Sequence, residues 1–467
     1  MTFTKINDDH LVKFRAIVGT EFVFTGRDDI ENYSHDYTED LKFYPEVVLK
    51  PNNTEQVAAI MKFCSEELIP VTPRGAGTGL SGGALPVRKG VILSMERFNR
   101  IIQIDERNQQ ATVEPGVINQ VFQDAVMEKG LFYPPDPASR GSCHLGGNLA
   151  ECAGGPKAVK YGVTKDYVLN CEVVLPSGEI IMTGANVLKN STGYNLTQLI
   201  IGSEGTLGII TKIIFRLIPL PKENLLMLAF FSSAEKACEA VSAIFRAGVT
   251  PSAMEFMERD CIEYVMKHVD VKIPLKENTA AQLIVEVDGN DKDVLFKECE
   301  VISEILNQHE CDEILFAESS QQKADLWKAR RSAGEAVKTH SIYKEEDTVV
   351  PRAELPKLLK GVKAIGNKYG FRSVCYGHAG DGNLHVNIIK ENLSDEAWNT
   401  LVPKGIREIF ELCVSLGGTI SGEHGIGYVQ KKYLDIAFSK TQIELMKGIK
   451  SVFDPKGILN PGKIFPS

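Results

Sequence analysis

The chain has 467 residues, of which 43% are hydrophobic and 24% are charged, and this length predicts two or three domains because it exceeds what one hydrophobic core supports. The net charge of −9 argues against a nucleic-acid-binding protein, and the lack of any apolar run of about eighteen residues predicts no transmembrane helix. The ten cysteines form no C-x-x-C pair and the N-terminus carries no secretory signal, which predicts a cytoplasmic protein without a zinc ribbon or an iron–sulfur cluster.

The first half of the chain predicts short strands and helices separated by glycine-rich loops. Residues 8–35 begin as a helix, residues 116–121 lead into another, and a third begins at Thr54, which is its expected N-cap. Strands are predicted at 46–49, 69–72, 90–94, 111–114, 171–175, 179–182 and 209–215, and the fifth and sixth of these form a hairpin around Pro176-Ser177-Gly178.

The composition changes after Pro219 and Pro221. Long helical segments then alternate with apolar strand segments, which predicts a separate α+β domain. The helices are expected at 233–247, 291–308 and 321–338, one strand at 283–287, and a last helix at the start of 440–467.

The segment Pro73–Gly83 is a glycine-rich loop that follows a predicted strand. Gly77, Gly79 and Gly82 fit the spacing G-x-G-x-x-G, but a Rossmann loop opens a helix, and here Pro86 and a further strand follow. Successive backbone N–H groups in such a loop still form a concave site that binds phosphate. The alternative is a surface turn.

Three more segments are unusually dense in glycine. Each alone would be interpreted as a tight turn, but with the first loop they indicate a groove whose backbone contacts a dinucleotide. They are residues 133–148, 153–162 and 202–209.

Two of the nine histidines, His378 and His385, combine with Glu423 into a ligand set for a divalent metal that leaves positions open for a substrate. His424 is then a candidate proton acceptor. Because an odd separation places side chains on opposite faces of a strand, a turn over residues 380–383 must join the two histidines. Asn387, two residues after His385, shares its face and is a candidate hydrogen-bond donor to a substrate. The alternative is a polar cluster without metal.

Six motifs in order along the chain carry a resemblance to a known family. They are PRGAGTGLSGG, YPPDP with the glycines after it, GSEGTLGII, GHAGDGNLHVNI, GEHGIG and ILNPGKIF. Together they resemble the FAD-linked 2-hydroxy-acid dehydrogenases, which include glycolate oxidase flavin subunits, D-lactate dehydrogenases and D-2-hydroxyglutarate dehydrogenases.

The resemblance implies an α+β fold of the vanillyl-alcohol-oxidase/p-cresol-methylhydroxylase type. A two-part FAD-binding domain would span residues 1–220, with its core at 43–220. A cap domain with the substrate site would span 221–430, and 431–467 would return to the FAD domain. FAD would be bound non-covalently, although His144 stands where relatives carry a small hydroxyl residue and leaves covalent attachment open. The implied FAD contacts are Arg74, Gly75, Ala76, Gly77, Thr78, Gly79, Leu80, Ser81, Pro135, Asp136, Gly147, Asn148, Gly154, Tyr161, Gly205, Ile210 and Asn460.

By the same resemblance His378, His385 and Glu423 would bind zinc, iron or manganese, and His424 would be the base. Arg330 would bind the substrate carboxylate through its planar guanidinium, with Arg331 as the competing residue. Lys344 matches a lysine near the substrate in hydroxyglutarate-type relatives.

The expected reaction oxidises a D-2-hydroxy acid, D-lactate or glycolate, with hydride transfer to flavin N5. Alternatives are D-2-hydroxyglutarate as substrate, or a non-catalytic flavin-binding subunit. Electrons would pass to a separate protein or a quinone. The sequence leaves open the acceptor, the metal, a homodimer and peripheral association with a membrane.

Overall fold

The computed structural model describes residues 2–38 and 41–466, and its internal contacts divide the chain into two compact units. The first unit comprises Met1–Ala153, Val163–Leu220 and Glu423–Ser467, and the second comprises Gly154–Gly162 and Pro221–Gly422. The expected domain boundaries after residues 220 and 430 stay predictions. The units differ from them because 154–162 joins the second unit and the last part of the first unit begins at Glu423.

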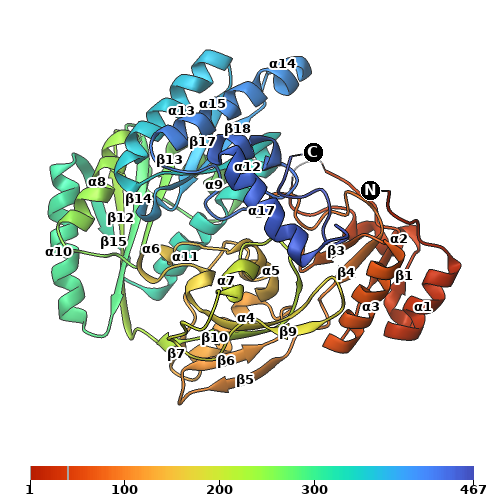
Figure 1. The fold of residues 1–467 in the computed structure, drawn as a ribbon. Helices are drawn as coiled ribbons and strands as arrows, with labels where there is room; N and C mark the ends of the chain where they lie inside the picture. The colour runs from red at the N-terminus through yellow and green to blue at the C-terminus, as the bar shows by residue number, and fades with distance from the viewer. Residues whose placement is uncertain (1, 39–40, 467) are drawn as a thin grey trace. The chain divides into compact units, whose positions relative to one another are not determined.

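One sheet of the first unit has the strand order β1-β2-β4-β3, in which β2, β4 and β3 run parallel (Figure 1). Apolar residues of α1 and α3, such as Phe14 and Ile60, pack on Val71 and Leu93 of its strands in one fully buried core. The elements are α1 (Asp8–Val18), β1 (Val23–Phe24), α2 (Arg27–Ile30), β2 (Val47–Leu49), α3 (Thr54–Glu67), β3 (Val71–Arg74) and β4 (Val91–Ser94).

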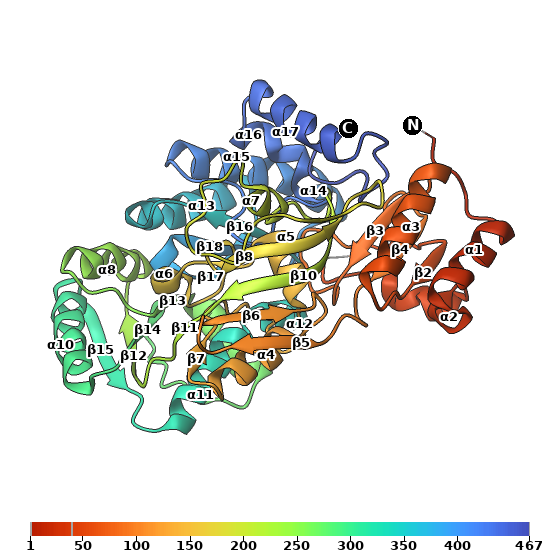
Figure 2. The same ribbon diagram turned by 60° about the horizontal axis from the view of Figure 1, so that its bottom comes forward.

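A second sheet of the first unit is antiparallel, with the order β5-β6-β10-β8-β9 (Figure 2). The predicted hairpin is confirmed as β8 and β9, closed by a Leu175 N–H bond to Glu179 O at 2.9 Å. The strands are β5 (Ile101–Asp105), β6 (Gln110–Val113), β8 (Val168–Val174), β9 (Ile180–Met182) and β10 (Ile209–Arg216). A separate two-stranded sheet pairs β7 (Leu131–Phe132) with β11 (Ile218–Pro219). The helices of this part and of the C-terminal segment are α4 (Asn119–Met127), α5 (Leu145–Glu151), α7 (Leu196–Ile200), α16 (Leu434–Ala437) and α17 (Lys440–Phe453).

The second unit is built on an antiparallel sheet with the order β15-β12-β14-β13-β17-β18-β16. The strands are β12 (Glu223–Phe231), β13 (Ala253–Glu258), β14 (Ala281–Gly289), β15 (Cys311–Phe316), β16 (Tyr343–Val349), β17 (Arg372–Gly377) and β18 (Asn383–Ile389). The helices are α6 (Ala158–Tyr161), α8 (Ala234–Arg246), α9 (Arg259–His268), α10 (Lys292–Gln308), α11 (Ser320–Arg331), α12 (Ala333–His340), α13 (Leu355–Tyr369), α14 (Asp395–Thr400) and α15 (Val402–Ser415).

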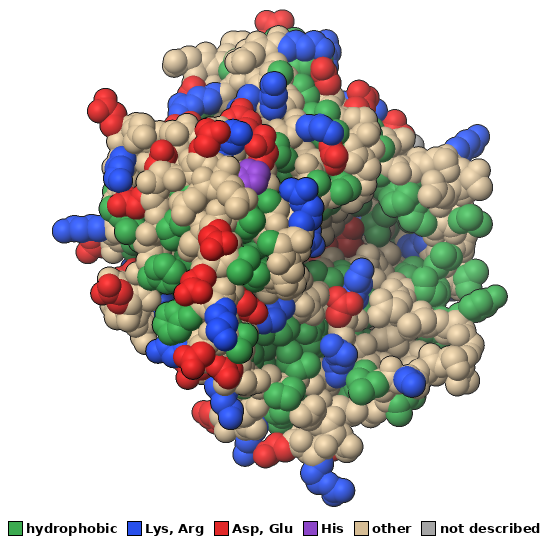
Figure 3. Space-filling view, turned by 90° about the vertical axis from the view of Figure 1, so that its left-hand side faces the viewer, with side chains coloured by type: hydrophobic (Ala, Val, Ile, Leu, Met, Phe, Trp, Pro, Cys, Tyr) green, Lys and Arg blue, Asp and Glu red, His purple; other side chains and the backbone are tan. Residues whose placement is uncertain are grey.

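Side chains of β12, β14 and α9 form a buried core with those of α12, which includes Phe230, Ile284, Ile262 and Val337. Helices α8, α10, α13 and α15 pack on one another and on the sheet. On the face seen in Figure 3, acidic and basic side chains are interspersed without a large area of one sign. The α+β prediction is confirmed for this part of the chain.

Two predicted details of the helices are wrong. Asn53, not Thr54, is the N-cap of α3, because the Asn53 side chain accepts the Gln56 N–H at 2.9 Å. The expected helix at 321–338 is two helices, α11 and α12, separated at Ser332. In the part of the chain that the structure describes, no helix is both long enough and apolar enough to cross a bilayer.

Candidate functional site

The second unit brings together polar side chains of β16, β17 and β18. His378 follows the last residue of β17, and a short 3-10 turn, Ala379–Asp381, leads through Gly382 into β18, which carries His385. The predicted turn between the two histidines is confirmed. Gly382 has φ +76°, and a Cβ there would overlap the Val350 carbonyl oxygen, so this turn requires glycine.

The two imidazoles lie close together in this turn. Their ring centroids are 5.5 Å apart, and one ring nitrogen of His378 lies within 4.8 Å of one of His385. On the other side of His378, Nδ1 is 2.8 Å from Glu255, a fully buried carboxylate on β13. A carboxylate in this position keeps the proton on Nδ1, so Nε2 has a lone pair for a metal.

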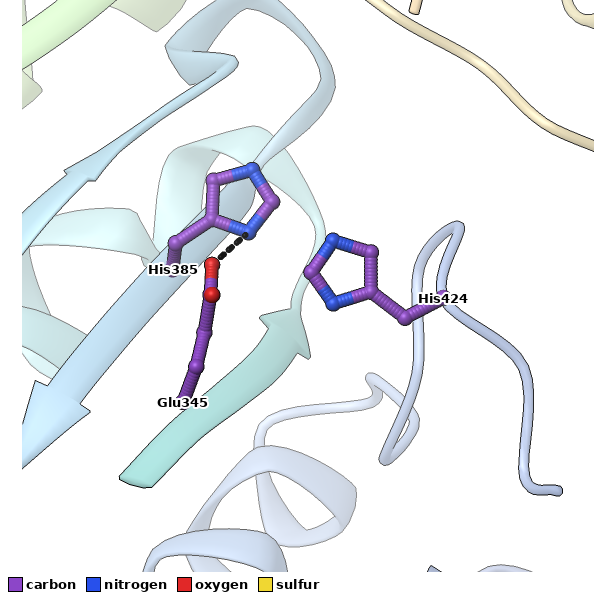
Figure 4. Close-up of side chains that lie close together, drawn as sticks. All are labelled: Glu345, His385 and His424. Atoms are coloured by element: carbon purple, nitrogen blue, oxygen red, sulfur yellow. Dashed lines mark ion pairs between the residues drawn. The ribbon is translucent and has the colours of Figure 1, made fainter. Parts of the chain in front are cut away.

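His385 is bordered by two acidic residues of the neighbouring strand. Its Nδ1 is 3.6 Å from the Glu345 carboxylate (Figure 4) and 3.8 Å from that of Asp347. The register pairs Asp347 with His385 and Glu345 with Asn387, which places all four on one face of the sheet. Burial raises the pKa of Tyr376, and its hydroxyl donates to Glu345 at 3.2 Å.

Asn387 is fully buried beside this cluster. Neither polar atom of its amide has a well-aligned hydrogen-bond partner among the described residues, although the Tyr376 hydroxyl is a near neighbour. Burying an unsatisfied amide costs roughly 1–3 kcal/mol. An amide in this state is suited to a bound polar ligand, and the role expected from the strand pattern stays a prediction.

Arg330 and Arg331 have different surroundings on α11. Arg330 is buried, its Nε lies 2.7 Å from Glu255, and its Nη2 has no hydrogen-bond partner among the described residues. The Arg331 guanidinium lies 5.1 Å from the centre of the Trp327 ring. Glu255 therefore brings Arg330 to His378, and the expected role of Arg330 toward a carboxylate stays a prediction.

Lys344 lies outside this cluster, and its expected role near the substrate stays a prediction. Successive side chains of a strand point to opposite faces, so Lys344 lies on the other face of β16 from Glu345. Its ammonium is 5.2 Å from the centre of the Trp398 ring, and Trp398 belongs to α14.

Glu423 and His424 follow the last residue of the second unit, Gly422. The Gly422 N–H donates to Asp347 Oδ2 at 2.8 Å, which fixes the chain beside the register partner of His385. Glu423 is the next residue after Gly422, and consecutive Cα atoms are about 3.8 Å apart. The Cα atom of Glu423 therefore lies one peptide unit from the residue that bonds Asp347. Figure 4 also draws His424, on the loop that continues from there.

In the first unit the glycine loop leaves the end of β3. Arg74 is buried, and its Nη2 donates to His35 O at 2.8 Å and to Asn32 O at 3.1 Å. The Arg74 Nη1 and Ser81 Oγ atoms are buried without hydrogen-bond partners in the described residues. The loop therefore offers donors that a phosphate would satisfy.

Gly79 and Gly147 show why the loops are glycine-rich. A Cβ at either position would meet no heavy atom within 4 Å, and neither has a positive φ. Neither packing nor backbone conformation requires glycine there, so the open space fits a group bound against the backbone, as expected for FAD. His144 lies against Gly75, where an added Cβ would be 3.7 Å from His144 Nδ1, and burial lowers the pKa of His144.

Other expected FAD contacts are structurally connected to these loops. Asn148 Nδ2 donates to Asn119 Oδ1 at 3.1 Å, and Asn119 Nδ2 donates to Pro135 O at 3.2 Å. Asn460 Nδ2 donates to Gly83 O at 3.1 Å, which returns the C-terminal tail to the glycine loop. Most of the expected FAD contacts fall in the first unit, but Gly154 and Tyr161 belong to the second. The remaining members in the first unit are Gly75, Ala76, Gly77, Thr78, Leu80, Asp136, Gly205 and Ile210.

The sequence interpretation missed Glu255, Glu345 and Asp347 in the second unit and Glu204 in the first. Only Glu255 could have been recognised as a candidate site residue from the sequence, because it is a carboxylate inside the apolar strand Ala253–Glu258. All four are buried or nearly so, and their partners lie far away in sequence.

Comparisons with known proteins agree with this arrangement. Residues 45–184 match the FAD binding domain family, and residues 220–464 match the C-terminal domain of FAD linked oxidases. The glycolate oxidase subunit GlcD of Bacillus subtilis is 40% identical, over 93% of this chain and 92% of its own length. A D-lactate dehydrogenase of Anaerostipes hadrus is 37% identical, over 99% and 98%.

A crystal structure of p-cresol methylhydroxylase has the same fold. It superimposes with a TM-score of 0.78 at 20% identity, over 97% of this chain and 96% of that chain. The expected fold type is thereby confirmed. With its glycine loops, its FAD-binding segment and its relatives in agreement, the chain belongs to the family of FAD-linked oxidases.

Proposed function

We propose that the protein oxidises a D-2-hydroxy acid, D-lactate or glycolate, to the 2-oxo acid with FAD and a divalent metal. The names of the two relatives, a glycolate oxidase subunit and a D-lactate dehydrogenase, support this substrate class. The observation that carries the proposal is Glu255, because one buried carboxylate contacts both His378 and Arg330. It joins a metal-ligand candidate to a carboxylate-binding candidate.

The residues fit a metal by their chemistry. His378 Nε2, His385 and Glu423 supply two imidazoles and one carboxylate, which suit zinc, iron or manganese. When bound, the cation would lower the pKa of the substrate hydroxyl and FAD would accept the hydride.

The chain's own residues then have separate tasks. Arg330 binds the substrate carboxylate through Nη2, and Asn387 bonds the substrate through its buried amide; neither group has a well-aligned hydrogen-bond partner among the described residues. His424 takes the hydroxyl proton on a ring nitrogen. Holding the substrate and the base in the reacting geometry supplies a large share of the rate enhancement of an enzyme.

The acceptor of the electrons is proposed to be a separate protein or a quinone. For D-2-hydroxyglutarate the sequence offered Lys344 as the partner of the second carboxylate, but Lys344 lies on the opposite face of β16 from Glu345 and Asp347. This placement favours the smaller substrates.

The variant His385→Ala tests the proposal. It should lose the metal and nearly all turnover of D-lactate and glycolate while FAD stays bound, as measured by metal analysis, steady-state kinetics and flavin absorbance. His340→Ala, an exposed histidine on α12, is the matched control and should keep both. Full activity of metal-free His385→Ala protein would show that the metal assignment is wrong.

A further inference from the structure

The loop that carries Glu423 and His424, residues 423–429, is held by a carboxylate for which the proposed chemistry has no role. Glu204 Oε1 accepts the Ile426 N–H at 2.8 Å, and Glu204 Oε2 accepts the Gly427 N–H at 2.6 Å. Glu204 is buried, with 6% of its surface exposed. Hydrogen bonds to a charged acceptor are roughly twice as strong as neutral ones.

Neighbouring contacts leave this loop little freedom. Ser81 O accepts the Tyr428 N–H at 2.8 Å, and Gly427 O accepts the Ile464 N–H at 2.8 Å. A Cβ at Gly427 would overlap the Ser81 carbonyl oxygen, and one at Gly425 would overlap the Glu151 carboxylate. The backbone just after His424 is therefore enclosed on several sides.

Glu204 is itself fixed in place. It has a left-handed backbone with φ +51°, which is uncommon for a residue other than glycine. Its N–H donates to Ala150 O at 2.8 Å, and its carbonyl oxygen accepts Asn460 Nδ2 at 2.8 Å. Loops 202–209 and 423–429 and the C-terminal tail thus meet at one residue, Glu204.

The two bonds need both carboxylate oxygens. Ile426 and Gly427 present consecutive N–H donors, and each takes one oxygen of Glu204. In glutamine one oxygen is replaced by an NH₂ group, which is a donor and would face an N–H. Glu204→Gln therefore removes one bond and makes its contact repulsive, at almost unchanged side-chain volume.

We propose that Glu204 is a positioning residue that sets the backbone after His424 and thereby the place of its imidazole. This inference rests on the proposed function, in which His424 is the base. Misplacing a reacting group by about 1 Å can cost roughly a hundredfold in rate.

A double-mutant cycle tests the inference. Glu204→Gln should keep FAD and metal, lower kcat for D-lactate roughly ten- to hundredfold and leave KM within about twofold. In the His424→Ala background the same substitution should change kcat by less than about twofold, because its effect passes through the imidazole. Equal losses in both backgrounds, or loss of FAD from Glu204→Gln protein, would overturn the inference. Glu179→Gln, an exposed residue of the first unit, is the control and should match the wild type.

Hydrogen exchange gives a readout that does not depend on turnover. The backbone amides of residues 423–429 should exchange faster in Glu204→Gln than in wild-type protein. The exchange rates of the β10 amides should stay the same. Unchanged exchange rates in residues 423–429 would also overturn the inference. Failure of the proposed function looks different, because wild-type flavin would then stay oxidised with every 2-hydroxy acid while the loop amides still responded to Glu204→Gln.

Discussion

At the scale of single residues, two asparagines on one face of β18 differ at their Nδ2 atoms, although the buried Oδ1 atoms of both have no well-aligned hydrogen-bond partner among the described residues. Asn383 Nδ2 donates to Asp347 Oδ1 at 2.7 Å and to Thr348 O at 3.0 Å. Asn387 is buried without a well-aligned hydrogen-bond partner in the described residues. The Nδ2 bonds of Asn383 stabilise the fold, and we propose that the amide of Asn387 bonds a ligand.

Replacement of Asn387 by leucine should therefore separate stability from activity. We expect Asn387→Leu to leave the free energy of unfolding of the ligand-free protein unchanged or higher, since an unsatisfied buried amide is removed at similar volume. The kcat/KM for D-lactate should fall roughly ten- to hundredfold, as for the loss of a hydrogen bond to a charged group. Denaturant unfolding and steady-state kinetics measure the two effects.

Asn383→Leu is the matched control. It should lower the free energy of unfolding by about 1–3 kcal/mol, because the buried carboxylate of Asp347 loses a donor. If Asn387→Leu destabilised the protein as much as Asn383→Leu, the amide of Asn387 would be structural, and its role toward a substrate would be contradicted.

The sequence predicts some of these residues and not others. The two-residue period of a strand places His385 and Asn387 together, and the glycines between His378 and His385 predict the turn. Glu255 contacts His378 from 123 positions away in sequence, and only the pairing of β13 with β17 brings them together. The sequence does not show which face of β16 meets His385, so it could not place Lys344 on the face opposite Glu345.

At the scale of elements, the glycines fall into two kinds. Some are required by the backbone conformation or by close packing, and others leave open space in which a cofactor could bind. Gly79 and Gly147 have open space around them, whereas Gly90 has φ +72° and a Cβ there would overlap the Pro70 carbonyl oxygen. All three are equally visible as glycines in the sequence. Only the surroundings distinguish a turn that requires glycine from a surface that would contact a ligand.

Alanine substitutions should show this difference. Gly79→Ala and Gly147→Ala should leave the thermal unfolding midpoint of FAD-free protein unchanged and weaken FAD binding by roughly tenfold or more, a cost of about 1.4 kcal/mol. Gly90→Ala should lower the midpoint, because a Cβ at positive φ is strained. Full FAD affinity in both of the first two variants would contradict the assignment of this loop to the cofactor.

Element boundaries followed local signals, but one error depends on a contact that is distant in the sequence. Asn53 and Thr54 are both good N-caps, and the choice between them depends on which side chain reaches the Gln56 N–H. Thr54 instead donates to Glu172 at 2.8 Å, a strand residue that no local pattern could identify. The interruption at Ser332 lies inside a continuous helical pattern.

At the scale of the whole molecule, the chain order does not follow the compact units. The first unit gathers three separate parts of the chain, and residues 154–162 join the second unit. Lys160 and Tyr161 explain this assignment, because both bond to Asp288 of β14, at 2.7 and 2.8 Å. The six motifs predicted the family, yet spacing along the chain could not predict which segments share a unit.

The central claim is that this FAD-linked oxidase removes a hydride from a 2-hydroxy acid with the help of a metal. Anaerobic mixing of the metal- and FAD-loaded protein with D-lactate, glycolate and D-2-hydroxyglutarate tests it most directly. We predict that D-lactate or glycolate bleaches the yellow flavin absorbance, and that a chelator stops the bleaching until metal is restored. A flavin that stays yellow with every one of these acids, or bleaches equally fast after complete metal removal, would contradict the account.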